Sequence, residues 1–309
     1  MTKSYFIGID GGGTLSRLVA IDKDMNIIGS HICGPTNITS VPYEKVFGNI
    51  QSLLSEFNAQ TGTRIEDCRS ICIGVAGAKT SDNASKTAKI FRDLGFWGNL
   101  TIMNDAELVL IAETKGEPGL AIIAGTGSVG FAMDHSGDIL RVGGWGHIID
   151  DGGSGYRIGM DAIKATLMDF DGRGAKTALT DMIKSKFELE EIPQILGHIY
   201  TDNFNKSKIA EIALLVSEAS SSGDIVAQSI EQNAADNLVS MAKVLIQKAR
   251  LNTHKIVLSG SIILHNQNIR AKFCHDILAD YPNMQIVCTS AKPEMGAAYL
   301  ALKQALNTH

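Results

Sequence analysis

The chain has 309 residues, of which 44% are hydrophobic and 20% charged, and its formal net charge is −5. This length and composition predict a well-packed globular protein with two domains, and they exclude a disordered one. The basic residues are scattered along the chain rather than gathered in a stripe, so no nucleic-acid partner is expected. No apolar run approaches ~18 residues, so no membrane span is expected either.

The cysteines and the first residues point to a cytoplasmic protein. The five cysteines are odd in number and lie in or near apolar stretches, which is typical of buried free thiols in a reducing compartment. Cys68 and Cys72 are four positions apart, but no second pair with metal spacing follows, so a zinc site is not expected. Residues 1–4 lead directly into an apolar stretch that reads as a strand, so no signal peptide is expected.

A glycine-rich hairpin follows at once. Residues 5–9 and 17–22 predict two strands, and the sequence Asp10-Gly-Gly-Gly-Thr14 forms the tip between them. Glycine tolerates positive φ and has no Cβ, so successive backbone N–H groups can surround an anion. A carboxylate would repel a bare phosphate, but it favours one that carries magnesium. The hairpin therefore predicts a Mg·nucleotide site, with an ordinary glycine-rich turn as the alternative.

Strands alternate with helices through the rest of the first 115 residues, which predicts an α/β domain with a mostly parallel sheet. Ligands of such sheets gather at the carboxyl ends of the strands, where Asp10, Gly77 and Asp105 would lie. The expected elements are strands over 27–33, 70–76 and 100–103, a helix whose apolar stripe is Val46, Ile50, Leu53, Leu54 and Phe57, and helices over 83–94 and 105–114.

The same pattern returns after a glycine- and proline-containing segment at 115–119, the expected linker. Residues 120–131 read as strand, glycine turn and strand, and 138–142 as a third strand, so we infer an internal duplication. Two such hairpins could grip a triphosphate from both sides. Helices are expected over 155–170, 175–186, 206–220, 224–250 and 294–306, and strands over 256–258 and 285–288. The helices of the chain that are rich in Asp and Glu, and the remaining histidines, are expected on solvated faces.

Four motifs in this order resemble the actin-like ATPase superfamily and, more narrowly, the N-acetylglucosamine kinase and BadF/BadG/BcrA/BcrD ATPase family. They are Asn104-Asp-Ala106, Ala124-Gly-Thr-Gly-Ser128, Gly143-Gly-Trp-Gly-His147 and Asp151-Gly-Gly-Ser-Gly-Tyr156. The resemblance implies a duplicated ribonuclease H-like α/β fold with two domains and a central cleft. It divides the chain into a domain of residues 1–115, completed by the helix 294–306, and a larger domain of residues 116–309 with a helical insertion.

The resemblance also implies ATP and Mg²⁺ as cofactors and assigns roles to single residues. Asp105 would be the catalytic base, and Asp10 would lie by the magnesium, through water. ATP would be held by Gly12, Gly13 and Thr14 at the first hairpin, by Gly125, Thr126 and Gly127 at the second, and by Gly260 at the adenosine. The sugar pocket would comprise Asn37, Asp105, Ser128, Gly144, Trp145, Gly146 and Asp151.

The function implied is transfer of phosphate from ATP to the 6-hydroxyl of an amino sugar, with N-acetylglucosamine first and glucosamine or N-acetylmuramate as alternatives. Two departures bear on which sugar is used, since Ser128 replaces an asparagine of the human-type enzymes and Gly152 stands where an acid often does. A homodimer is expected. Simpler roles stay open: helix cap for Asp105, loop brace for His147 and Asx-turn for Asp151.

The sequence argues against two other functions. The same family contains ATP-driven activators of radical dehydratases, which hold an iron–sulfur cluster through cysteines, but residues 105–165 contain no cysteine. A nucleotide-binding regulator or a chaperone-like relative is the other, but no DNA-binding arm precedes the first strand and no peptide-binding domain follows the last.

Overall fold

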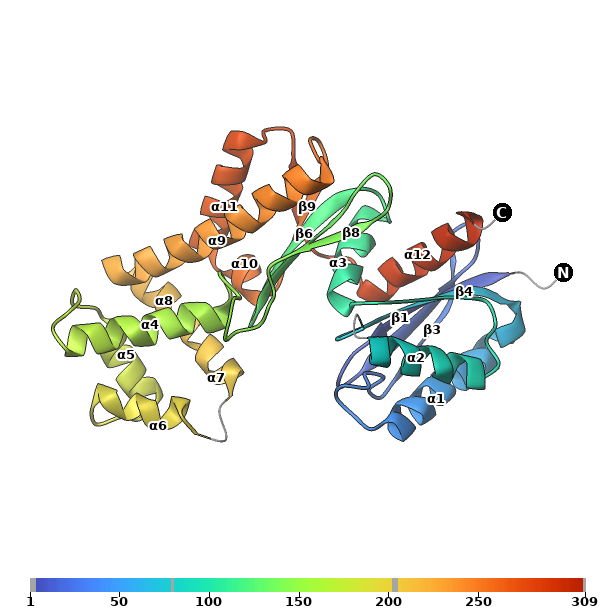
Figure 1. Ribbon diagram of the computed structural model, residues 1–309, viewed down its shortest axis with the longest axis horizontal. Coiled ribbons are helices and arrows are strands. Elements are labelled where there is room, and N and C mark those ends of the chain that lie inside the picture. Colours follow the sequence, from blue (N-terminus) through green and yellow to red (C-terminus); the bar gives the residue numbers. More distant parts are fainter. Residues whose placement is uncertain (1–3, 79–80, 202–204, 308–309) are drawn as a thin grey trace. The chain divides into compact units, whose positions relative to one another are not determined.

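The computed structural model describes residues 4–78, 81–201 and 205–307, which form two compact units (Figure 1). Unit 1 takes the described residues of 1–118, 135–137 and 289–309, and unit 2 those of 119–134 and 138–288. The chain therefore first passes from unit 1 to unit 2 after Pro118, inside the segment expected to link the domains. No helix in the described part of the chain combines the length and apolarity that a membrane span requires.

Each unit contains a five-stranded sheet, and the two sheets have the same topology. In both, the first three strands form an antiparallel meander, and the fourth and fifth strands extend the sheet in parallel from the first. The prediction of a duplicated ribonuclease H-like fold is thereby confirmed. The prediction of a mostly parallel sheet was wrong, because the first three strands are joined by hairpins and hairpin-connected strands must pair antiparallel. The strands are β1 (Tyr5–Gly11), β2 (Ser16–Ile21), β3 (Ile27–Cys33), β4 (Cys68–Val75) and β5 (Asn99–Met103) in unit 1, and β6 (Gly119–Ala124), β7 (Ser128–Met133), β8 (Ile139–Val142), β9 (Lys255–Ser259) and β10 (Gln285–Cys288) in unit 2.

The two faces of the unit 1 sheet bury different side chains. Tyr5, Ile7 and Ile9 of β1 lie in an apolar core with α1 (Tyr43–Thr61) and α2 (Ser81–Asp93). All five residues of the predicted apolar stripe on α1 are buried. Alternate residues of a strand point to opposite faces, so Gly8 and Asp10 face the other way, toward α3 (Asp105–Thr114) and α12 (Pro293–Asn307).

Glycines let α12 approach this second face closely (Figure 1). A Cβ on Gly8 would lie 2.2 Å from both the Glu294 carbonyl oxygen and the Ala298 nitrogen. On the helix itself, a Cβ on Gly296 would lie 2.6 Å from the carbonyl oxygen of Leu108 in α3. The start of α12 is thereby held against the strand that ends in Asp10.

Helices make up most of unit 2. The longest, α9 (Ile225–Ala249), has a continuous buried face that packs on the sheet, and Leu245 and Met241 occupy the space above Gly130 of β7. The helix expected over 206–220 is two helices, and the one expected over 175–186 begins later, at Leu179. The helices of unit 2 are α4 (Gly155–Phe170), α5 (Leu179–Lys186), α6 (Leu196–Ile199), α7 (Lys206–Ala210), α8 (Ile212–Ser221), α9 (Ile225–Ala249), α10 (Ser261–His265) and α11 (Gln267–Asp280), with a 3-10 turn at Ile192–Ile195 and another at Ile65–Asp67 in unit 1.

Candidate active site

The first glycine hairpin joins β1 to β2. A Cβ on Gly12 would lie 2.3 Å from the Leu15 carbonyl oxygen, so only glycine allows this tight turn. The carbonyl of Gly12 accepts a hydrogen bond from the Thr36 N–H at 3.2 Å, which fixes the base of the turn. Gly13 and Thr14 are exposed. The tip can therefore offer its backbone N–H groups to an anion.

Two hydroxyl residues that the sequence did not single out support this hairpin. Ser16 and Thr36 are fully buried, and their hydroxyl oxygens are 2.8 Å apart. Ser16 Oγ also accepts from the Thr36 N–H at 3.1 Å. The pair ties the start of β2 to the loop that follows β3. Its partners are twenty positions apart in the sequence, so no local pattern could have revealed it.

Asp10 and Asp105 are brought to the same face of the unit 1 sheet. Asp10 pairs in register with Gly74 of the parallel strand β4, so both positions point to one face. A Cβ on Gly74 would lie 3.1 Å from the Asp105 Cα. The missing side chain at Gly74 thus leaves space for the start of α3 beside Asp10.

Asp105 is the first residue of α3, and the helix is capped by its neighbour. The Asn104 side chain accepts from the Ala106 N–H at 3.0 Å, so the cap role expected as an alternative for Asp105 belongs mainly to Asn104. Asp105 Oδ1 also accepts from the Ala106 N–H at 2.9 Å. Burial raises the pKa of Asp105, while hydrogen bonds from the N–H groups of Ala106 and of Asp105 itself oppose that rise. The carboxyl group is a stronger base than an exposed aspartate.

The surroundings of Asp10 fit a divalent cation. Burial and the nearby carboxylates of Glu294 and Asp105 raise the pKa of Asp10 to about 6, and Arg17 opposes them. Glu294 is itself buried, and its Oε2 has no hydrogen-bond partner among the described residues. These carboxylates leave negative charge that a cation would offset.

The described residues do not contain three Asp, Glu, His or Cys side chains grouped closely enough to hold a metal by themselves. Mg²⁺ does not need such a group, because it keeps several waters and binds through one or two carboxylates and substrate phosphates. Asp10 beside a phosphate-binding hairpin therefore suits magnesium that arrives with a nucleotide.

Asn37 lies in the loop after β3 and is buried. Its Oδ1 accepts from the Thr39 N–H at 2.9 Å and from the Thr39 hydroxyl at 2.8 Å. These bonds fix the amide orientation, and the described residues provide no partner for the Nδ2 group. A donor held in this way is available to a ligand hydroxyl or carbonyl.

In unit 2 the second glycine loop is joined to the start of α4. The N–H of Gly155 donates to the Gly125 carbonyl at 2.8 Å, and the N–H of Tyr156 donates to the Thr126 carbonyl at 3.2 Å. Ser154 caps the helix through a hydrogen bond from the Arg157 N–H. The loop carbonyls therefore point to the helix, which constrains the loop that holds Thr126.

Asp151 and Ser128 lie together beside this loop. A Cβ on Gly127 would lie 3.0 Å from Asp151 Oδ2. The Ser128 hydroxyl donates to the Gly152 carbonyl at 2.8 Å. Asp151 has φ +62° and is buried, and burial raises its pKa while a hydrogen bond from the Gly146 N–H lowers it. The structure thus gathers three predicted sugar-binding residues, Ser128, Gly146 and Asp151.

Trp145 lies on the glycine-rich loop between β8 and α4. Its side chain is 68% exposed and stacks on the Arg141 guanidinium, 4.7 Å from the ring centroid. Gly144, with φ +70°, packs its backbone against Val129, where a Cβ would approach Val129 Cγ2 to 2.7 Å. The indole is therefore presented on a shaped backbone, with most of its surface open to a ligand.

His147 makes an edge-to-face contact with Tyr156, with ring centroids 4.9 Å apart. Tyr156 belongs to the start of α4, where the Thr126 loop is also held. The contact supports the expected bracing role of His147.

A cavity of about 450 Å³ opens beside Thr126 in unit 2. Its floor is the second glycine loop with Gly155, one wall comes from α7 and α8, and the other from α10 and the residue that follows it. Gly260 does not line the cavity itself. It packs against the second glycine loop, since a Cβ there would lie 2.5 Å from the carbonyl carbon of Ala124. The wall residues are Ser207, Ala210, Glu211, Ala213, Leu214 and Ser217 on one side and Ser261, Ile262, His265 and Asn266 on the other.

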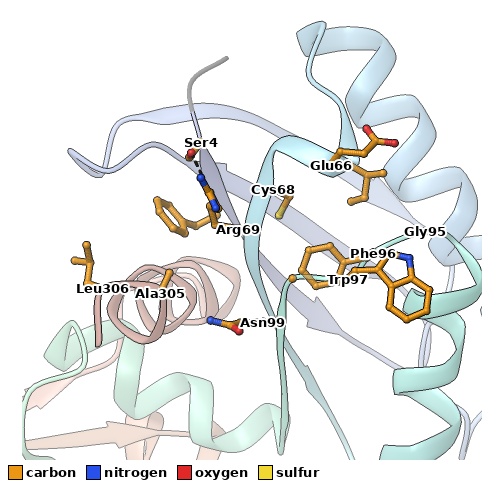
Figure 2. A pocket seen from close by; sticks show the side chains of 13 residues that line it. Ser4, Glu66, Cys68, Arg69, Gly95, Phe96, Trp97, Asn99, Ala305 and Leu306 are labelled. Atoms are coloured by element: carbon orange, nitrogen blue, oxygen red, sulfur yellow. Dashed lines mark hydrogen bonds between the residues drawn. The ribbon is translucent and has the colours of Figure 1, made fainter. Parts of the chain in front are cut away.

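A larger hollow, of about 580 Å³, lies elsewhere in unit 1 (Figure 2). It is lined by Cys68 and Asn99, which begin β4 and β5, and by the exposed Trp97. These are the amino ends of the strands, whereas Asp10 and the glycine hairpin lie at the carboxyl end of β1. The hollow is therefore separate from the residues that carry the chemistry.

Comparison with known proteins agrees with this geometry. The model of the BadF/BadG/BcrA/BcrD ATPase family matches residues 7–301. An N-acetylmuramic acid/N-acetylglucosamine kinase of Clostridium acetobutylicum is 34% identical over 96% of this chain and 98% of its own length. An N-acetyl-D-glucosamine kinase of Dictyostelium discoideum is 31% identical over 98% of this chain and 99% of its own.

A solved structure from Chromobacterium violaceum, provisionally described as an N-acetylglucosamine kinase, has the same fold with a TM-score of 0.70. It is 23% identical, and the match covers 98% of this chain and 100% of that one. The family match spans both glycine hairpins and both carboxylates of the site. The chain belongs to the BadF/BadG/BcrA/BcrD ATPase family.

Proposed function

We propose that the protein transfers the terminal phosphate of ATP to the 6-hydroxyl of an amino sugar, with N-acetylglucosamine as the preferred substrate. The observation that carries the proposal is the placement of Asp105, a partly buried carboxylate, on the same face as Asp10 beside a glycine hairpin. The names of the two curated relatives support the choice of sugar.

Asp105 is the proposed general base. Phosphoryl transfer asks the protein mainly for positioning and neutralisation of charge. The raised pKa of Asp105 makes its carboxylate better able to accept the proton of the sugar 6-hydroxyl as that oxygen attacks the γ-phosphorus. The Asn104 cap and the N–H of Ala106 hold the carboxylate at the start of α3, so the hydroxyl meets an oriented acceptor.

The phosphates are the proposed ligands of the two glycine loops. Gly12, Gly13 and Thr14 offer backbone N–H groups at the first loop, and Thr126 and Gly127 do so at the second. The Gly125 N–H donates to the Gly127 carbonyl at 2.9 Å and so supports the shape of the second loop. Magnesium, when bound with ATP beside Asp10, supplies the positive charge that offsets the phosphates. Asp10 would hold this magnesium through water, as a carboxylate beside the phosphate-binding hairpin.

The sugar is the proposed ligand of Asn37 and Asp105 in unit 1 and of the cluster around Asp151 in unit 2. Asn37 Nδ2 can donate to a sugar oxygen, and the Asp151 carboxylate can accept from a sugar hydroxyl. Trp145 offers an indole face to the apolar face of a pyranose ring. Ser128 contributes a shorter side chain than asparagine would, which leaves more room near the sugar.

That room supports N-acetylmuramate as a second candidate substrate, since this sugar carries a lactyl ether that needs space. The Clostridium acetobutylicum relative is named for both sugars. We propose a cytoplasmic enzyme, because ATP is available in the cytoplasm and the described cysteines are free. That it acts as a homodimer stays a prediction.

A sugar panel tests the proposal. ADP release from ATP is measured with N-acetylglucosamine, N-acetylmuramate, glucosamine and glucose in turn. The proposal predicts release that depends on an N-acetylated sugar, with kcat/KM highest for N-acetylglucosamine. Release that is independent of every sugar would contradict it and would favour an ATPase of another kind.

A further inference from the structure

The buried carboxylate of Glu231 lies at a junction of helices in unit 2. Glu231 is in α9 and is only 3% exposed. Burying a carboxylate costs free energy unless hydrogen bonds compensate it. Its partners are hydroxyl and amide donors from two other parts of the chain.

These donors come from α8 and from the junction of α10 with α11. The Ser220 hydroxyl of α8 donates to Glu231 Oε2 at 2.6 Å. The Asn268 amide donates to the same oxygen at 2.8 Å, and the Asn266 amide donates to Oε1. Asn268 also reaches the Ser220 hydroxyl oxygen at 3.3 Å. One carboxylate therefore joins α8 to the α10–α11 junction.

The same two elements both line the cavity beside Thr126. Ser217 of α8 lines that cavity one turn before Ser220, and Asn266 lines it directly from the other wall. Asn266 Oδ1 is engaged too, since it caps α11 by accepting from the Ile269 N–H at 2.9 Å. Both ends of the Asn266 amide are thus fixed, one by α11 and one by Glu231.

We propose that Glu231 is a positioning residue for the nucleotide, whose carboxylate sets the separation of the two cavity walls between which the nucleoside of ATP binds. The proposal rests on the proposed function, because it takes the occupant of this cavity to be the nucleotide. Glu231 does not line the cavity, so it acts through Ser220 and Asn266. Ordering the walls in advance removes an entropic cost from binding.

An exchange of donor and acceptor tests the clamp. In Glu231→Gln one of the two acceptor oxygens becomes an N–H₂ group that faces a donor, whichever way the new amide is turned. In Asn266→Asp two carboxylates face each other, so each single variant loses a hydrogen bond of the clamp. In the double variant the new amide at position 231 can donate to the new carboxylate at position 266, whose other oxygen still caps α11. Ser220 and Asn268 can still donate to the remaining oxygen at position 231.

The readout is the Kd of Mg·ADP by calorimetry, with the Kd of N-acetylglucosamine and the Tm measured alongside. Each single variant should raise the Kd of Mg·ADP about tenfold, since a buried group is left unpaired. The double variant should return within about twofold of wild type. The Kd of the sugar without nucleotide should not change.

Lys272→Gln is the matched control. Lys272 of α11 also joins that helix to α9, through Asp236 at 2.8 Å, and pairs with Asp276 within α11 at 2.6 Å. None of the three residues lines the cavity. This variant should leave the Kd of Mg·ADP unchanged. Should a single variant fail to fold, Ser220→Ala removes one of the three donors to Glu231, together with the weaker acceptor for Asn268, and should raise that Kd about threefold.

The outcomes separate the two claims. Single variants that bind Mg·ADP like wild type, whatever their Tm, would overturn the positioning role and leave the kinase proposal standing. A double variant that binds as weakly as the singles would overturn it as well. A wild-type protein that does not bind Mg·ADP would overturn both.

Discussion

Replacing Asp10 with asparagine should stabilise the nucleotide-free protein while it removes function. Burial and the carboxylates of Glu294 and Asp105 raise the pKa of Asp10 from its ordinary 3.8 to about 6. A rise of this size corresponds to a ceiling of about 3 kcal/mol of lost stability at neutral pH. Asp10 is only partly buried and solvent screens its charge, so we expect a gain of about 1–2 kcal/mol for Asp10→Asn.

The gain should depend on pH in a defined direction. A carboxyl group whose pKa is raised by folding is protonated in both states below its unfolded pKa of 3.8. Its ionisation therefore costs almost nothing near pH 4, an increasing amount as the pH rises, and the full amount above about pH 6. The stability difference between Asp10→Asn and wild type should grow across this window and then level off.

Urea unfolding in EDTA from about pH 4 to about pH 7.5 measures this difference. Asp24→Asn removes an exposed carboxylate from the turn between β2 and β3 and should change stability little at any pH. With saturating Mg·ADP the order should reverse, because wild type binds it better. An Asp10→Asn variant that is less stable than wild type in EDTA at neutral pH would refute the reasoning, as would a gain that is the same at every pH.

Three further substitutions, one of them with a matched control, test the packing, the sugar site and the nucleotide site. Gly8→Ala should destabilise unit 1 by about 3 kcal/mol or more, because its Cβ would meet the α12 backbone at 2.2 Å. The control Gly48→Ala places a Cβ in open space inside α1 and should stabilise by up to about 1 kcal/mol. Urea unfolding compares the free energies of unfolding of the two variants with that of wild type. Trp145→Ala should leave Tm nearly unchanged because the indole is exposed, but should raise KM for N-acetylglucosamine about five- to tenfold. Gly260→Ala should weaken Mg·ADP binding measured by calorimetry, since its Cβ would lie 2.5 Å from the Ala124 backbone and its φ is +92°.

Local pattern was enough to predict the elements that build the site. The apolar spacing of α1 and the alternation of strands with glycine turns depend on neighbours in the sequence, and the repeat of that pattern revealed the duplicated fold. The helix that begins at Asp105 was predicted for the same reason. The break at Glu211 that divides α7 from α8 was missed, because no glycine or proline marks it.

The main error of the sequence-based prediction concerns acidic residues in helices, which were expected on solvated faces. Glu107, Glu231 and Glu294 are instead 2%, 3% and 7% exposed. The partners of Glu231 lie 11, 35 and 37 positions away, so only the tertiary fold brings donors to it. Glu294 reaches the neighbourhood of Asp10 because Gly8 lets α12 approach β1, a close contact that no sequence pattern shows.

A comparison of wild type with Asp105→Asn tests the central claim most directly. Single-turnover transfer of phosphate from ATP to N-acetylglucosamine is followed together with the Kd of Mg·ADP. We predict that the variant folds and binds Mg·ADP like wild type but transfers phosphate about 10²–10⁴ times more slowly, as the loss of a general base requires. A variant that transfers phosphate at the wild-type rate would contradict the account.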